Sequence, residues 1–290
     1  MVFEGINNLP LFAAQSNGFF AKRGLDIELK FALNSEELRN GLAGGRFQIV
    51  HAVSDNAVSI VDVAKVDAAI VIGCDNGMNS VIAQPDIGSV ADLRNKAVAV
   101  DAPNTAFAFQ LYEFLRQKGV NKEDYAVKSV GATGPRFEAM QQDKTLAATM
   151  LYPPFSISAA KAGFKDFGEA TKVIGPYQAF SGIVLRSWAS ANADTLVRYL
   201  AGYIESQRFV LDPRNTAETV KLIADHLKTS EDVALGSYEA LRRGLAKDAA
   251  FDMEGFRNVL ALRARFSGKA LQAPEAYLDL SYYEKALAAL

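Results

Sequence analysis

The sequence has few of the residues that bind metals or form covalent cross-links. It contains one cysteine, Cys74, and two histidines, His51 and His226, among 290 residues. A single cysteine excludes an intramolecular disulfide and a cysteine-cluster metal site. His51 lies between apolar residues of a buried-type strand, so we interpret it as a core histidine rather than a base or a ligand. We therefore expect no metal site.

An excess of charge of one sign and long apolar runs are also missing. The 31 basic and 33 acidic residues give a formal net charge of −2 and are interspersed. Without a basic tail or stripe, nucleic acid is not an expected partner. No apolar run approaches the roughly 18 residues that a membrane span needs. The length is sufficient for two lobes of ordinary domain size.

Motifs of common enzyme classes are absent too. The chain has no Ser/His/Asp motif, no HExxH motif, no Walker loop and no dinucleotide-binding GxGxxG. We therefore expect no cofactor, and catalysis is weakly supported.

The stretch from residue 9 to residue 29 predicts a helix followed directly by a strand. Pro10 suits a first helical turn, because its missing N–H has no helical partner there. Lys22 and Arg23 suit the last turn, where the helix dipole favours cations, and Gly24 suits a left-handed C-terminal cap. Apolar and charged residues then alternate over 25–30, which predicts a strand with one face in water.

The chain continues with alternating helix and strand patterns, which predict a parallel sheet covered on both faces. Asn34 and Glu37 have the spacing of a capping box at a helix start. From Trp188 onward the pattern is helical. Strands are expected at 47–53, 67–73, 80–83, 127–131, 146–151 and 179–186, and one more follows a short helix within 89–100.

Several of these stretches resemble one family. The first of them is similar to the opening of the nitrate/sulfonate/taurine and thiamine-pyrimidine group of ABC-transporter substrate-binding proteins. It consists of Ala14-Gln15, then Gly18-Phe19-Phe20, then basic residues, and then residues 24–28. The resemblance runs from about residue 9 to residue 186. Further matching stretches are 42–49, where the family usually has Asp in place of Gln48, 89–100 and 152–155.

The resemblance implies an α/β fold with two lobes, the type 2 periplasmic-binding-protein fold, and a hinge of two crossing strands. Lobe one would comprise residues 1–82 and 184–290, with the C-terminal helices packed on it, and lobe two residues 83–183. We expect a monomer that captures a small polar organic ligand: a sulfonate, an aromatic or carboxylic acid, or a pyrimidine-like molecule. Its partner would be an ABC-transporter permease and its location the periplasm, with the signal segment removed or absent from this sequence.

An enzyme of the same fold, acting on a small carboxylated or heterocyclic substrate, is the alternative. Related enzymes that make the thiamine pyrimidine carry a clustered-cysteine motif, and the single Cys74 argues against that activity.

Polar residues at the expected strand ends are the candidate ligand-binding residues. In open parallel sheets, ligands bind beyond the carboxyl ends of strands, where helix N-termini present free N–H groups. Each such residue can equally be a helix cap. The candidates are Asn8, Ser54, Asp55, Asp75, Asn104, Thr105, Thr133, Arg136 and Tyr152.

Three candidates have specific expected roles. Tyr152 precedes two prolines and could stack on a ligand in an open cleft that leaves its ring partly in water, although a core position is the alternative. Asp55 would repel a sulfate-like anion and favour a ligand with N–H or O–H donors. Arg136 could neutralise a ligand carboxylate or sulfonate, or lie in solvent at the cleft rim. Phe12, Phe107 and Phe109 could wall the pocket.

Overall fold

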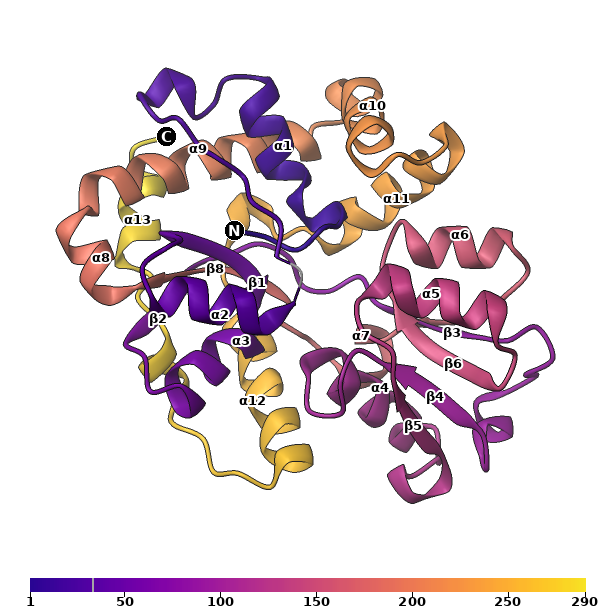
Figure 1. Ribbon diagram of the computed structural model, residues 1–290. Coiled ribbons are helices and arrows are strands. Elements are labelled where there is room, and N and C mark those ends of the chain that lie inside the picture. Colours follow the sequence, from indigo (N-terminus) through magenta and orange to yellow (C-terminus); the bar gives the residue numbers. More distant parts are fainter. Residues whose placement is uncertain (33) are drawn as a thin grey trace.

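Two α/β bodies, each built around its own sheet, make up the protein (Figure 1). The computed structural model describes residues 1–32 and 34–290. We call lobe one the part around the three-stranded sheet, residues 1–74 and 180–290. We call lobe two the part around the five-stranded sheet, residues 80–174. The predicted arrangement of two α/β lobes is confirmed.

The sheet of lobe one has the order β1-β8-β2, with β1 at Ile49–Val53, β8 at Phe180–Leu185 and β2 at Ala68–Gly73. β8 runs antiparallel to both neighbours, so β1 and β2 are parallel but not adjacent. The predicted parallel sheet is therefore interrupted by the strand that returns from lobe two. Gly182 allows this close packing, because a Cβ there would lie 2.7 Å from Ile72 Cγ2.

The opening unit departs from its prediction. The expected helix divides into α1, Leu9–Ser16, and a short 3₁₀ turn, Ala21–Arg23, because Gly18 adopts a positive φ of 69° between them. Gly24 caps this turn with a φ of 67°, as predicted. Residues 25–30 alternate between half-buried apolar and exposed charged side chains, but they form no ladder. The strand prediction is wrong because Ile27 offers its carbonyl to Gln15 Nε2 of α1, at 2.7 Å, instead of to a strand.

Lobe two has the strand order β5-β4-β6-β3-β7. β4 is parallel to β5 and β6, whereas β3 is antiparallel to β6 and β7. The carboxyl ends of β4, β5 and β6 therefore share one edge, and each leads into the helix that follows it. The strands are β3 Ser80–Ala83, β4 Ala97–Val100, β5 Ala126–Ser129, β6 Leu146–Leu151 and β7 Lys165–Glu169, and the helices that follow β4, β5 and β6 are α4 Ala106–Gln117, α5 Thr133–Gln142 and α6 Phe155–Lys161.

Residues 75–79 and 175–179 connect the lobes. They lie side by side, since the Ala179 amide donates to the Asp75 carbonyl at 3.0 Å. The boundaries predicted at 82/83 and 183/184 fall inside β3 and β8. Strand pairing places all of β3 in the sheet of lobe two and all of β8 in the sheet of lobe one, so both crossings begin earlier in the chain than predicted.

The remaining helices mostly cover lobe one, where α9 packs on α1 and α13 (Figure 1). However, α11 also contacts α6, and α12 also contacts α4, so two C-terminal helices reach lobe two. Within the described residues, no helix is both long and apolar enough to cross a membrane. The helices not yet given bounds are α2 Ser35–Ala43, α3 Asp55–Val58, α7 Thr171–Ile174, α8 Arg186–Ala191, α9 Ala193–Leu211, α10 Thr216–Leu227, α11 Glu231–Gly244, α12 Met253–Ser267 and α13 Ser281–Ala288, and a π-helical turn lies at Ser59–Val63.

Candidate functional site

The strand-end loops of the two lobes meet in a seam, and Tyr152 joins the lobes there. Its hydroxyl donates to the Glu4 carbonyl of lobe one at 2.9 Å, and its ring lies 6.0 Å from the ring of Phe107. Only 7% of Tyr152 is exposed. The expectation of a partly exposed ring is therefore wrong: the lobes are in contact at this corner, and the ring forms part of that contact.

Replacing Tyr152 should therefore change stability as well as any binding. Tyr152→Phe removes one buried hydrogen bond and should lower the free energy of unfolding by about 1 kcal/mol. Tyr152→Ala also empties the ring's volume and should cost about 3–5 kcal/mol. Urea unfolding of the two variants checks this order. Equal, negligible losses would place the ring in solvent, as the sequence first suggested.

Arg136 is a buried cation, with 1% of its surface exposed. Nε donates to Thr149 Oγ1 at 3.2 Å, Nη1 to the Gly131 carbonyl at 2.6 Å, and Nη2 to Thr133 Oγ1 at 3.3 Å and the Met150 carbonyl at 3.0 Å. Burial lowers the pKa of Arg136 from its usual value. No carboxylate forms an ion pair with it in residues 1–32 and 34–290. The expectation that it lies in solvent is wrong, since the first turn of α5 faces the end of β6.

Asp55 is paired rather than free. Arg263 Nη1 of α12 lies 2.7 Å from Asp55 Oδ2, and both side chains are largely buried. Burial raises the pKa of Asp55, whereas Arg263 opposes the rise. Asp55 was expected to repel a sulfate-like anion and to favour a ligand with N–H or O–H donors. Arg263, from a helix distant in sequence, offsets the charge and so weakens the expected repulsion, whereas Oδ1 keeps its capacity to accept a hydrogen bond.

Asp75, which begins the first crossing, is a buried carboxyl with no cation beside it in the described part of the chain. The Gly77 amide donates to Oδ1 at 2.9 Å, and Oδ2 has no partner there. Burial raises the pKa of Asp75 to about 7. At neutral pH this group is therefore close to half protonated, and it can donate or accept a hydrogen bond at the seam.

The other candidates mainly hold the protein's own backbone. Ser54 Oγ donates to the Ala179 carbonyl and lies 2.6 Å from Ser181 Oγ, which fixes the end of β1 to β8. Thr105 is the N-cap of α4, and Asn104 beside it is exposed. Asn8 donates to the Phe3 carbonyl, and Thr133 accepts from Arg136. The capping interpretation thus accounts for Thr105.

Five side-chain atoms along the seam are buried without a partner at hydrogen-bond geometry in the described residues. Buried polar groups are normally paired, so such atoms call for an explanation. Both lobes and the first crossing contribute them: Asn7 Oδ1, Asp55 Oδ1, Asp75 Oδ2, Asn76 Oδ1 and Gln110 Nε2.

Two further contacts lie near these atoms. Asn79 Nδ2 of the first crossing donates to Gln110 Oε1 at 3.2 Å. Burial raises the pKa of Tyr177 in the second crossing, and the charge of Asp55 adds to this rise, whereas the side chain of Gln110 opposes it. Sequence reasoning missed Gln110, Tyr177 and Arg263. Gln110 lies one turn inside α4 and Arg263 within an apolar stripe, so neither follows a strand end.

Two further features of the structure, the surroundings of His51 and a pocket beside the crossings, contain none of the predicted site residues. His51 lies 2.9 Å from Tyr199 Oη and 3.3 Å from Cys74 Sγ, buried inside lobe one, which agrees with a core histidine. A pocket of ≈ 330 Å³ opens beside the crossings, lined by parts of α6, β7 and α11 together with 76–78 and 176–177. None of the nine predicted residues lines it.

Two α/β lobes, joined by two crossings and meeting at their strand ends, define the periplasmic-binding-protein fold. The sequence of residues 3–224 matches the model of the NMT1-like family. The chain therefore belongs to the NMT1-like family, and no curated protein matches it.

Solved structures share the fold at low sequence identity. The ligand-binding component of an ABC-type import system from Staphylococcus aureus, with zinc bound, has a TM-score of 0.81 and 15% identity, covering 97% of this chain and 95% of the other. The alkanesulfonate-binding protein SsuA from Xanthomonas axonopodis pv. citri, bound to MOPS, has a TM-score of 0.76 and 13% identity, covering 98% of this chain and 95% of the other. The periplasmic nitrate-binding protein NrtA from Synechocystis PCC 6803 has a TM-score of 0.78 and 13% identity, covering 98% of this chain and 86% of the other.

Most of the similar structures are binding proteins, but the fold also occurs in an enzyme, DSZB, a mutant of which was solved in complex with biphenyl-2-sulfinic acid.

Proposed function

We propose that this protein is the solute-binding component of an ABC importer and encloses a small polar organic ligand in the seam between its lobes. A permease would receive the ligand, and the protein would work as a monomer in the periplasm. The observation that carries the proposal is the set of buried, partnerless polar atoms contributed by both lobes at their strand ends. A bound ligand would supply the missing hydrogen bonds, whose absence costs about 1–3 kcal/mol for each buried group.

The chemistry of these atoms favours one part of the expected ligand range. Asp55 Oδ1 and Asp75 Oδ2 accept hydrogen bonds, and Gln110 Nε2 donates. Four of the five N–H groups of Arg136 are already directed at the protein's own oxygens. A ligand rich in N–H or O–H donors, with at least one acceptor, meets these needs. Amine-bearing heterocycles such as aminopyrimidines fit better than nitrate.

Catalysis is the less favoured function. A nucleophilic cysteine requires the thiolate. Cys74 is buried, and burial raises the pKa of its thiol far above the usual value. Burial also lowers the pKa of His51 to about 3, so its imidazole stays neutral at physiological pH and cannot stabilise a thiolate as an imidazolium would. The Cys74–His51 contact therefore lacks the electrostatics of an activated pair.

A paired ligand screen tests the proposal. We expect an aminopyrimidine to raise the melting temperature in a concentration-dependent way, and nitrate to leave it unchanged. Binding to the folded state alone stabilises it by about 2.7 kcal/mol at a hundredfold excess over the dissociation constant. Aliphatic sulfonates and aromatic acids complete the screen. Calorimetric titration of the best ligand, with product analysis by mass spectrometry, separates binding from turnover.

Gln110→Leu tests the location of the site. The variant removes the unpartnered Nε2 and should weaken binding about tenfold or more, the equivalent of one lost buried hydrogen bond. Gln142→Leu, at an exposed position at the end of α5, is the matched control. Unchanged binding in Gln110→Leu would exclude the seam, and conversion of the ligand would favour the enzyme alternative.

A further inference from the structure

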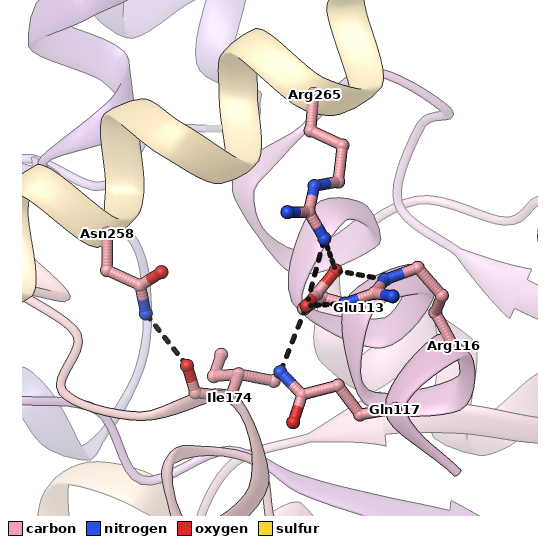
Figure 2. A network of polar contacts seen from close by, with 6 residues as sticks. All are labelled: Glu113, Arg116, Gln117, Ile174, Asn258 and Arg265. Carbon is pink, nitrogen blue, oxygen red and sulfur yellow. Dashed lines mark hydrogen bonds and ion pairs between the residues drawn. The ribbon is translucent and has the colours of Figure 1, made fainter. Parts of the chain in front are cut away.

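Three side chains of α12, those of Asn258, Arg265 and Phe266, contact lobe two or the crossing beside it, although the helix belongs to lobe one. Figure 2 shows Arg265 directed at Glu113 of α4, and Asn258 directed at the Ile174 carbonyl at the end of α7. Arg265 Nη1 lies 3.0 and 3.3 Å from the two oxygens of Glu113. Asn258 Nδ2 donates to the Ile174 carbonyl at 3.0 Å and to the Pro176 carbonyl at 2.8 Å.

Glu113 is prepared for this contact by its own helix. Arg116 bonds both of its oxygens, at 2.9 and 2.7 Å, and Gln117 Nε2 bonds Oε1 at 2.9 Å (Figure 2). Burial raises the pKa of Glu113, but these donors and Arg265 outweigh it and bring the pKa below its usual value. The carboxylate is therefore ionised at neutral pH and held in position by α4 alone, so Arg265 meets a preformed acceptor.

An aromatic contact accompanies the ion pair. The ring of Phe266 stacks at 5.9 Å on Phe109 and makes an edge contact with Tyr112 at 5.5 Å, with an interplanar angle of 69°. Both partners are buried residues of α4, and Phe266 is partly buried between the lobes. Aromatic pairs of this geometry stabilise beyond the area they bury. The contact thus combines polar and apolar elements, all independent of any ligand.

We propose that Asn258, Arg265 and Phe266 form a latch, the α12 latch, that holds lobe two against lobe one in the ligand-free protein. Arg263 of the same helix pairs with Asp55 at the seam, so one helix contacts both the candidate site and the opposite lobe. The latch sets how often the binding-competent closed form is populated. Its effect on affinity rests on the proposed function, whereas its effect on lobe closure does not.

The expected effect on affinity follows from population arithmetic. The apparent dissociation constant equals the intrinsic one divided by the fraction of molecules in the competent state. A latch variant that leaves about one molecule in ten closed should therefore weaken binding about tenfold, without altering any residue of the seam. Without ligand, the same latch variant should show a wider separation of the lobes than the unaltered protein.

Electron spin resonance distance measurement tests closure directly. Spin labels are placed at Lys144→Cys in lobe two and Glu284→Cys in lobe one, both exposed positions, while the buried Cys74 stays unlabelled. In the Arg265→Gln/Phe266→Ala variant without ligand, we expect a longer and broader distance distribution. Arg265→Glu, which changes only a half-exposed side chain and repels Glu113, should shift the distribution in the same direction without emptying any core volume.

The control is Lys221→Gln/Phe164→Ala, which breaks the Lys221–Asp225 pair within α10 and the Phe137–Phe164 contact within lobe two. It should leave the distances unchanged. Folded latch variants with the distance distribution of the unaltered protein would overturn the latch. If no ligand is found in the screen but the latch variants open, the latch stands and the proposed function does not.

Discussion

Arg263→Met should be among the most destabilising single substitutions at the seam. It leaves the Asp55 carboxylate buried without its ion-pair partner, and breaking a buried pair in this way typically costs about 3–5 kcal/mol. The pair is almost fully enclosed, with side-chain exposures of 11% for Arg263 and 7% for Asp55. Urea unfolding at pH 7 measures the loss directly.

The double variant Asp55→Asn/Arg263→Met is the decisive companion. With the carboxylate replaced by a neutral amide, the methionine should cost much less than it does alone. A buried ion pair exchanged as a unit for neutral groups is often tolerated. Additive losses in the two single variants and the double variant would show that Asp55 and Arg263 are not coupled, and would contradict the pairing at 2.7 Å.

Asp75→Asn should change the pH dependence of stability. Because burial raises the folded-state pKa of Asp75 to about 7, from 3.8 when unfolded, the folded state binds more protons between these values. The stability of the unaltered protein therefore falls as pH rises from about 4 to 7 through this group. A difference of about three pKa units corresponds to about 4 kcal/mol. The asparagine variant should lack this loss.

The measurement is the free energy of unfolding of both proteins from pH 4 to pH 8. The variant should gain stability relative to the parent as pH rises, and the gain should level off above pH 8. Burial lowers the pKa of His51 to about 3, which gives both proteins the same opposite slope below pH 6.5 and cancels in the comparison. Asp26→Asn, at an exposed aspartate, is the control. A pH-independent difference for Asp75→Asn would mean that Asp75 is solvated or paired.

Local signals in the sequence predicted most elements, because their causes are local. Asn34 caps α2 by accepting from the Glu37 amide at 2.9 Å, and Gly24 ends the first helical unit in the left-handed region. β6 was predicted at its observed bounds from one apolar run. The strand at 25–29 failed although its alternation is observed, since a burial pattern does not state which partner supplies the hydrogen bonds.

The candidate site was only partly predictable, for the same reason. Strand ends selected Asp55 and Asp75, which follow β1 and β2 where the lobes meet, because parallel strands direct their carboxyl ends to one edge. Arg136 was selected in the same way, but its hydrogen bonds stay within lobe two. The electrostatic states of these residues depend on burial and on partners that a strand-end pattern does not name. Asp55 is neutralised by a residue 208 positions later, and Arg136 is enclosed by the backbone of β6. No local pattern carries that information.

The position of β8 has a consequence for the order in which the protein folds during synthesis. β8 lies between β1 and β2, so the sheet of lobe one lacks its central strand until residue 185 has been made. The strands of lobe two, from residue 80 to residue 169, are continuous in the chain and need no later segment for their pairing. Lobe two can therefore fold first, whereas the edges of β1 and β2 stay unpaired until β8 has been made. Lobe one is completed last. Its strand pairs join residues separated in the sequence by the whole of lobe two, and contacts of such large sequence separation form slowly.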